Sequence, residues 1–163
     1  MGLLILGSQV RILQGAPEYK GGQVMIDSFD GEYAFLSNFY PVSIPYQGLT
    51  YPSVEHAYQA SKSIETFERW AVLTSRTPGL AKKIGRTLNI RSNWEEIKLG
   101  IMEELLLIKF SQEPCKTMLL NTGEEEIIEN NYWGDTYWGT CKGVGSNHLG
   151  KLLMKTREKI SNS

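Results

Sequence analysis

Residues 51–62 read Tyr-Pro-Ser-Val-Glu-His-Ala-Tyr-Gln-Ala-Ser-Lys, and this stretch decides how the chain folds. Pro52 restricts Tyr51 to an extended backbone. Ser53 can accept the N–H groups that a new helix leaves unpaired. Glu55 then falls in the first helical turn, where the positive end of the helix dipole stabilises a carboxylate. The stretch therefore predicts a strand end, a turn, and a helix that runs to about residue 64.

Three polar side chains of this helix, Glu55, Gln59 and Lys62, recur at i, i+4 and i+7 and share one face. Together they present a carboxylate, an amide and an amine. Small and apolar residues occupy the adjacent face, where they can pack against a core. A capped surface helix carries the same kind of polar stripe, and the spacing alone favours that interpretation.

The chain has 163 residues and a formal net charge of −1. This length suits one domain of ordinary size, and the composition is that of a soluble globular protein. A near-zero charge provides no bulk positive field to recruit nucleic acid or an anionic membrane. No apolar run approaches the length of a membrane span, so we expect no membrane partner.

The cysteines and histidines are too few and too scattered to form a metal site. Cys115 and Cys141 lie outside any CxxC motif, and His56 and His148 share no metal-like spacing with them. We therefore expect neither structural zinc nor a disulfide framework. Free thiols suit a reducing compartment, which favours a cytoplasmic location.

The first 24 residues differ from the rest of the chain. Residues 1–6 are apolar, but the run is too short for a signal peptide and no basic segment precedes it. Residues 15–23 are rich in glycine, proline and polar groups. We interpret residues 1–24 as a non-native or disordered extension and residues 25–163 as a single domain. An extra strand over residues 3–6 is the alternative.

Downstream of Met25 the pattern predicts an α+β domain, dominated by helices, with a small antiparallel sheet built from residues 26–51 and 127–129. Strands are expected over 26–29, 42–46 and 49–51, with a hairpin turn at Gln47-Gly48. Further helices are expected over 65–73, 78–84 and 114–120, and from Asn147 onward. Thr77-Pro78 is a typical helix start.

The longest helix is predicted to start at Ser92, because Ser92 and Glu95 match a capping box. Its apolar residues recur at three- and four-residue spacing, so one face belongs to the core. These residues are Trp94, Ile97, Ile101, Met102, Leu105 and Ile108.

The glycine-rich loop over residues 130–147 is the second candidate for chemistry. It places Tyr132, Trp133, Tyr137 and Trp138 around Asp135. Aromatic faces beside a carboxylate suit a base or a sugar ring, although both tryptophans can instead fill the core. No GxGxxG, GxxxxGK[ST] or GxSxG motif is present.

A basic group, Lys82, Lys83, Arg86 and Arg91, surrounds a predicted helix C-terminus. Cations are expected there because of the helix dipole, and a phosphate site is the alternative. His56, by its place on the helix, is more typical of a packed or exposed residue than of a base.

Several motifs resemble the NADAR family, also called YbiA-like, and the resemblance extends from about Phe29 to Arg157. The motifs are Leu36-Ser37-Asn38-Phe39, Tyr51 to His56 with Gln59-Ala60 and Lys62, Ile84-Gly85-Arg86, Trp94-Glu95 with Lys98 and Met102, Lys109-Phe110, Trp133-Gly134-Asp135, and Asn147 with Leu149-Gly150. The chain departs from many relatives at Tyr51, where tryptophan is common, and at Ser63, where an aromatic residue often follows the lysine. These departures bear on substrate fit more than on chemistry.

The resemblance implies an N-glycosidase that cleaves the bond between ribose C1 and a nitrogen. Two substrate classes are implied: phosphoribosyl-amino pyrimidines of the riboflavin pathway, and ADP-ribose attached to guanine, either free or in nucleic acid. It implies no metal and no cofactor.

Candidate roles follow from this chemistry. Glu55 can act as general acid and then as base, or Lys62 can attack C1 and form a Schiff base if burial lowers its pKa. Asp135 can orient ribose hydroxyls or stabilise positive charge. The residues expected to bind substrate are Asn38, Phe39, His56, Gln59, Arg86, Tyr132, Trp133, Trp138 and Asn147.

The alternative function is a binding module that holds ADP-ribose without cleaving it. A pure reader has no need of both Glu55 and Lys62, so their presence favours the enzyme. Direct DNA binding by a scaffold protein is disfavoured by the charge balance.

Overall fold

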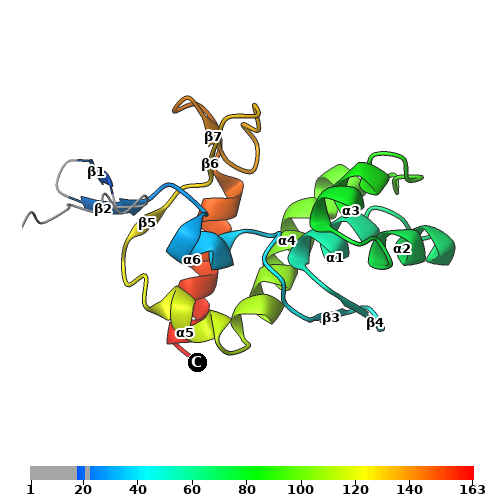
Figure 1. The fold of residues 1–163 in the computed structure, drawn as a ribbon, viewed down its shortest axis with the longest axis horizontal. Coiled ribbons are helices and arrows are strands. Elements are labelled where there is room, and N and C mark those ends of the chain that lie inside the picture. Colours follow the sequence, from blue (N-terminus) through cyan, green and yellow to red (C-terminus); the bar gives the residue numbers. More distant parts are fainter. Residues whose placement is uncertain (1–17, 21–22) are drawn as a thin grey trace, which may run out of the picture.

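The structure is a computed structural model that describes residues 18–20 and 23–163. The predicted α+β fold with a dominance of helices is confirmed (Figure 1). The alternative strand over residues 3–6 lies outside the described residues. Regular structure starts before Met25, because the strand containing this residue begins at Gln23 and pairs with an earlier one.

The helical elements follow one another along most of the chain. They are the 3-10 helix η1 (Gly31–Leu36) and the α-helices α1 (Val54–Ala60), α2 (Thr66–Leu73), α3 (Pro78–Gly85), α4 (Trp94–Phe110), α5 (Cys115–Leu120) and α6 (His148–Ser161). Helix α4 spans the molecule (Figure 1): it packs against α1 on one side and against α5 and α6 on the other. Among the described residues, no helix is both long and apolar enough to cross a bilayer.

The strands are short and form three small sheets. They are β1 (Glu18–Lys20), β2 (Gln23–Ile26), β3 (Ile44–Tyr46), β4 (Leu49–Tyr51), β5 (Glu126–Ile127), β6 (Asn130–Asn131) and β7 (Thr140–Cys141). The predicted β3–β4 hairpin is confirmed. The single antiparallel sheet is not, because β2 pairs parallel with β5 and lies in a separate sheet from the hairpin. The helices between β2 and β5 form the long crossover that parallel pairing needs.

Two of the four predicted N-cap residues, Ser53 and Thr77, have the expected side-chain cap. Ser53 Oγ accepts the His56 N–H at 3.2 Å, and Thr77 Oγ1 accepts the Leu80 N–H at 3.1 Å. These hydroxyls satisfy N–H groups that the first helical turn leaves free.

The capping box at Ser92 is wrong, because α4 begins at Trp94 and its N-cap residue is Asn93. A tight turn precedes the helix: the Trp94 N–H donates to the Arg91 carbonyl at 3.1 Å. The Asn93 side chain accepts from Arg91 Nε at 3.0 Å, and Glu95 pairs with Lys98. These contacts leave Ser92 outside the helix.

Helix α1 is buried on every side, so the interpretation of its polar stripe as a solvated surface is wrong. All seven of its residues are buried, and Glu55 and Gln59 are only 7% and 4% exposed. Helices α2, α3 and α4 and the β3–β4 hairpin surround it. A short helix in this position brings polar groups into the interior, where each needs a partner.

The core-facing stripe of α4 is confirmed for Trp94, Ile101 and Leu105, which are all buried. Leu106 is fully buried in the same core, whereas its neighbour Leu107 is 37% exposed. Because Leu106 and Leu107 have the same helix propensity, replacing each of them in turn isolates the contribution of core packing in α4.

We expect Leu106→Ala to destabilise the fold by about 2–5 kcal/mol, because it removes buried methyl groups and leaves a cavity. Leu107→Ala should stay within about 1 kcal/mol of wild type, since that side chain is partly solvated. Urea denaturation followed by circular dichroism measures both. Equal losses in the two variants would contradict the central position of α4.

Candidate functional site

Glu55 is held in the interior by its own helix and by the preceding loop. Its backbone N–H donates to the Asn38 carbonyl at 3.0 Å, and Gln59 Nε2 donates to its Oε1 at 2.7 Å. Burial raises the pKa of the Glu55 carboxyl, against the lowering effects of the Gln59 hydrogen bond and of Lys82 and Lys62. The site therefore contains a carboxyl group biased toward its protonated form.

Lys62 follows the C-terminal end of α1 and is partly buried. Its Nζ lies 5.8 Å from the ring centroid of Tyr58 and 6.0 Å from that of Trp94. Its backbone is fixed on both sides: the N–H donates to the Gln59 carbonyl, and the carbonyl accepts the Arg91 N–H at 2.8 Å. Lys62 is thus a lysine on rigid backbone against aromatic faces.

Desolvation lowers the pKa of the Lys62 amine, and the nearby Glu55 opposes this change. Lys82, Arg86 and Lys98 lower it further. Three further cationic side chains therefore lie within electrostatic range of Lys62. Such a group favours the neutral amine and, equally, an anionic ligand.

Asp135 lies near Glu55 in space, although 80 positions separate them: its charge contributes to the raised pKa of Glu55. One carboxylate oxygen, Oδ1, accepts the N–H groups of Tyr137 and Trp138 at 3.0 and 2.9 Å. The Asp135 backbone exchanges two further hydrogen bonds with the Asn131 side chain, at 3.0 and 2.7 Å. This turn holds the carboxylate in place.

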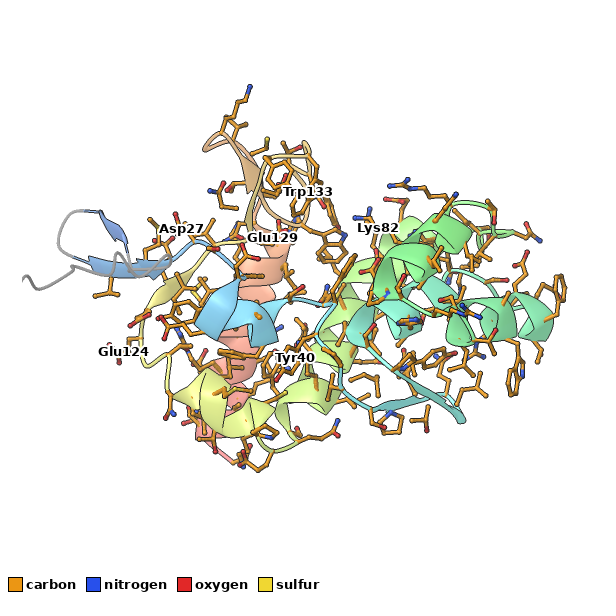
Figure 2. The ribbon with its side chains drawn as sticks, viewed as in Figure 1. Asp27, Tyr40, Lys82, Glu124, Glu129 and Trp133 are labelled. Carbon is orange, nitrogen blue, oxygen red and sulfur yellow. The ribbon has the colours of Figure 1, made fainter. Side chains whose placement is uncertain are left out.

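Glu129 is a site residue that the sequence reasoning missed. Desolvation raises the pKa of its carboxyl to about 7; Asp135 acts in the same direction, and the Asn131 hydrogen bond and Lys82 act against it. Figure 2 shows Lys82 on α3 facing the segment that carries Glu129 and Trp133. The sequence feature that could have indicated Glu129 is its position directly before the glycine-rich loop over residues 130–147.

Gly139 makes room for the Glu129 carboxylate. A Cβ atom at position 139 would lie 1.6 Å from Glu129 Oε2 and 2.0 Å from the Glu129 backbone oxygen. The Thr140 N–H donates to that same carbonyl at 2.8 Å, which draws the two ends of the loop together. Position 139 therefore requires a glycine because Glu129 approaches its backbone closely, and not only because the chain turns there.

The aromatic residues of the loop divide into two groups. The Trp138 ring packs at 5.5 Å on Tyr58 of α1, and Tyr58 packs at 5.1 Å on Trp94 of α4. Trp133, by contrast, is 56% exposed and Tyr132 is 91% exposed, with their rings 5.1 Å apart. Core filling is therefore correct for Trp138 and wrong for Trp133.

His56 has a structural role in the fold. It is 2% exposed, and its ring nitrogens lie 2.7 Å from Ser53 Oγ and 3.1 Å from the Ser75 carbonyl oxygen. Burial lowers its pKa, which favours the neutral ring. Because both nitrogens already have protein partners, the structure does not support the prediction that His56 binds substrate.

Asn147 has a structural role, and its substrate contact stays a prediction. It is the N-cap residue of α6, as expected, but its side chain does not cap the helix. Its Oδ1 accepts the Glu129 N–H at 2.9 Å and its Nδ2 donates to the Ile127 carbonyl at 3.0 Å. It therefore ties the start of α6 to the strand segment that precedes the loop.

Of the other predicted binding residues, Arg86 and Phe39 are exposed. Arg86 caps the end of α3 and contributes to the cationic group around Lys62. Asn38 Oδ1 and Gln59 Oε1 are buried acceptors without a hydrogen-bond donor in the described part of the chain. Acceptors of this kind suit ligand hydroxyl or N–H groups. In the same part of the chain, no group of three or more His, Cys, Asp or Glu side chains could hold a metal ion.

We expect the Glu129 carboxyl to titrate near pH 7. Between its usual value of 4.5 and about 7, the folded protein binds a proton that the unfolded chain has lost, so stability falls as pH rises. Glu129→Gln should flatten this part of the stability curve, and Lys82→Met should move the titration upward. Carbon-13 NMR of labelled glutamate and urea denaturation at several pH values measure these effects. A Glu129 pKa at or below 4.5 would contradict the desolvated position.

A model of the NADAR domain family matches residues 26–161. N-glycosidase Npun_R5314 from Nostoc punctiforme is 37% identical over 137 residues, which cover 80% of this chain and 87% of that protein. N-glycosidase YbiA from Escherichia coli strain K12 is 34% identical over 138 residues, which cover 82% of this chain and 86% of that protein.

Two further similarities concern a longer protein and a solved structure. The riboflavin biosynthesis protein VVA0006 from Vibrio vulnificus is 36% identical over 135 residues, which cover 80% of this chain but 36% of that protein. The NMR structure of the Escherichia coli protein YbiA superposes with a TM-score of 0.76 at 33% identity. It covers 85% of this chain and 84% of the solved one, so the two proteins share the fold over that part.

Proposed function

The chain belongs to the NADAR family and hydrolyses N-glycosyl bonds, and we propose that it cleaves the C1–N bond of a phosphorylated ribosyl group by means of Glu55 and Lys62. One observation carries this proposal. A buried carboxyl with a raised pKa and a partly buried amine with a lowered pKa lie within electrostatic range of each other. Burial pushes both groups toward neutrality, which an acid and a nucleophile need at neutral pH.

Glu55 is proposed as the general acid. A glycosidic C–N bond breaks more easily when its nitrogen is protonated, and a carboxyl with a raised pKa can still supply a proton at neutral pH. The Gln59 amide at 2.7 Å fixes the carboxyl, so that the proton is delivered from a defined position.

Lys62 is proposed as the nucleophile. Its neutral amine adds to C1 as the C1–N bond breaks, and the leaving nitrogen takes the proton from Glu55. Nζ next loses a proton to the Glu55 carboxylate, and the C1–O4 bond breaks as O4 takes that proton. The ring-opened sugar is then held on Nζ as a protonated imine. Water hydrolyses this imine, releases the sugar and restores the amine, with Glu55 acting as base. In the alternative mechanism Glu55 activates water directly, and Lys62 only supplies positive charge.

The cationic group formed by Lys62, Lys82, Arg86 and Lys98 favours a substrate that carries phosphate. A phosphoribosyl-amino pyrimidine fits this requirement, and the names of the relatives, N-glycosidase and riboflavin biosynthesis protein, support it. ADP-ribose attached to guanine is the second candidate. The exposed Tyr132 and Trp133 rings favour it, since they offer a stacking surface for a larger base.

The first test incubates the protein with a phosphoribosylaminopyrimidine and, separately, with ADP-ribosylated guanosine, and follows release of the base by mass spectrometry. Glu55→Gln should lower kcat by about 10²–10⁴-fold, the usual range for losing a general acid. Lys62→Ala should cost at least as much. Borohydride should trap a ribosyl adduct on the wild-type protein and none on Lys62→Ala. Lys83→Ala, which removes an exposed amine from the same region, is the matched control.

The outcomes distinguish the alternatives. An active wild type without an adduct leaves Glu55 as the principal catalyst and refutes the covalent role of Lys62. Tight binding of ADP-ribose without cleavage of either substrate supports a binding module in place of the enzyme.

Gly85 offers a test of the Gln59 contact. A Cβ atom at Gly85 would lie 1.9 Å from Gln59 Oε1, whereas one at Gly79, in the same helix, would have Thr77 Oγ1 as its nearest neighbour at 3.9 Å. We expect Gly85→Ala to displace the Gln59 amide from Glu55 and to lower kcat by about tenfold or more, because small misplacements are costly in catalysis. Gly79→Ala should keep wild-type turnover. Unchanged kcat in Gly85→Ala, measured with the cleavable substrate, would show that Gln59 is not needed.

A further inference from the structure

Lys109 is a fully buried lysine near the end of α4, with 0% of its surface exposed. Its Nζ donates to the Ser37 carbonyl at 2.8 Å and lies 5.4 and 5.0 Å from the ring centroids of Tyr40 and Phe110. Among the described residues it forms no ion pair. A lysine without a carboxylate partner is an unusual occupant of a core, because its desolvation is not repaid by an opposite charge.

The Ser37 carbonyl belongs to a turn that carries Asn38. The Tyr40 N–H also donates to this carbonyl at 3.1 Å, so the Ser37 oxygen accepts two hydrogen bonds, one from Tyr40 and one from Lys109. The next carbonyl, that of Asn38, accepts the Glu55 N–H at 3.0 Å. Two consecutive peptide groups, joined at Asn38, therefore connect the Lys109 amine to the backbone of Glu55.

The turn has a further anchor on α4. Asn38 Nδ2 donates to Met102 Sδ at 3.5 Å, while Asn38 Oδ1 is buried and has no donor among the described residues. The segment from η1 to β3 crosses from the α6 side of the molecule to the α1 side, and this turn lies on it (Figure 1). Met102 and Lys109, which lie seven positions apart on α4, thus fix a loop that contacts the start of α1.

We propose that Lys109 is a positioning residue, which holds the Ser37–Asn38 turn against α1 and thereby sets the placement of Glu55 and of the unpaired Asn38 oxygen. This inference rests on the proposed function. A hydrophobic residue of the same length would fill the space as well, but it would leave the turn with one donor fewer. On this proposal, the contact serves to place the turn and not to stabilise the fold.

The electrostatic surroundings agree with this role. Burial lowers the pKa of Lys109 to about 7, and Cys115 acts against this shift. The groups that face the amine are the Cys115 thiol on α5, the Tyr40 and Phe110 rings and the Ser37 carbonyl. With or without its extra proton, the amine retains N–H groups that can donate to the Ser37 carbonyl.

The test uses Lys109→Met in the full chain, with Leu105→Met as the matched control, since Leu105 is also fully buried on α4. Replacing an unpaired buried charge by an apolar residue of similar shape should not destabilise the fold. We expect Tm to stay within about 3 °C of wild type or to rise. Amide hydrogen exchange should quicken over residues 37–41 and at the Glu55 N–H and stay unchanged in α6. With the cleavable substrate, kcat should fall about tenfold or more while KM changes little.

Lys109→Arg retains a cationic donor, and it should recover part of the lost kcat at equal stability. Wild-type kcat and exchange in a folded Lys109→Met protein would overturn the proposal. So would a Lys109→Met protein that fails to fold, because Lys109 would then hold the core as a whole. The exchange measurement needs no substrate. A loosened turn in a protein whose wild type cleaves neither substrate would therefore refute the proposed function and leave the positioning contact intact.

Discussion

The structure depends on one constraint, which is the complete burial of the seven-residue helix α1. A helix surrounded on all sides needs small residues where neighbours approach, and Ala57 and Ala60 are fully buried. It also carries polar groups into a region that does not solvate them. The Gln59–Glu55 hydrogen bond at 2.7 Å partly offsets the cost of burying these two polar side chains. The close approach of Gln59 to Gly85 fixes the distance between α1 and α3.

The loop after β5 is organised around this helix by packing and by hydrogen bonds. Trp138 packs on Tyr58, which joins the loop to α1 and, through Trp94, to α4. Reciprocal bonds between Asn131 and Asp135 make the turn rigid before any ligand is present. The carboxylate of Asp135 is thus delivered to the vicinity of Glu55 by a preformed turn, which lowers the entropic cost of assembling a site from distant segments.

The sequence predicted those features that are decided locally. The caps at Ser53 and Thr77 depend on a hydroxyl and the next few N–H groups. Helix α2 begins one residue after the predicted start and ends at the predicted residue. The burial of Glu55 was not predictable, because it depends on α3, whose approach to α1 is a tertiary event. The same applies to the parallel β2–β5 pairing and to Glu129, whose pKa reflects surroundings that lie far away in sequence.

The separation of the two proposed catalytic groups is as important as their proximity. Glu55 and Lys62, both among the described residues, form no ion pair, and desolvation is the largest influence on the pKa of each. A direct salt bridge would reverse both shifts, since each charge would stabilise the other. The carboxyl would then be a poor acid and the amine a poor nucleophile. Aromatic rings beside Lys62 and an amide beside Glu55 keep the two groups near each other without pairing them, and this arrangement preserves their reactivity at a cost in stability.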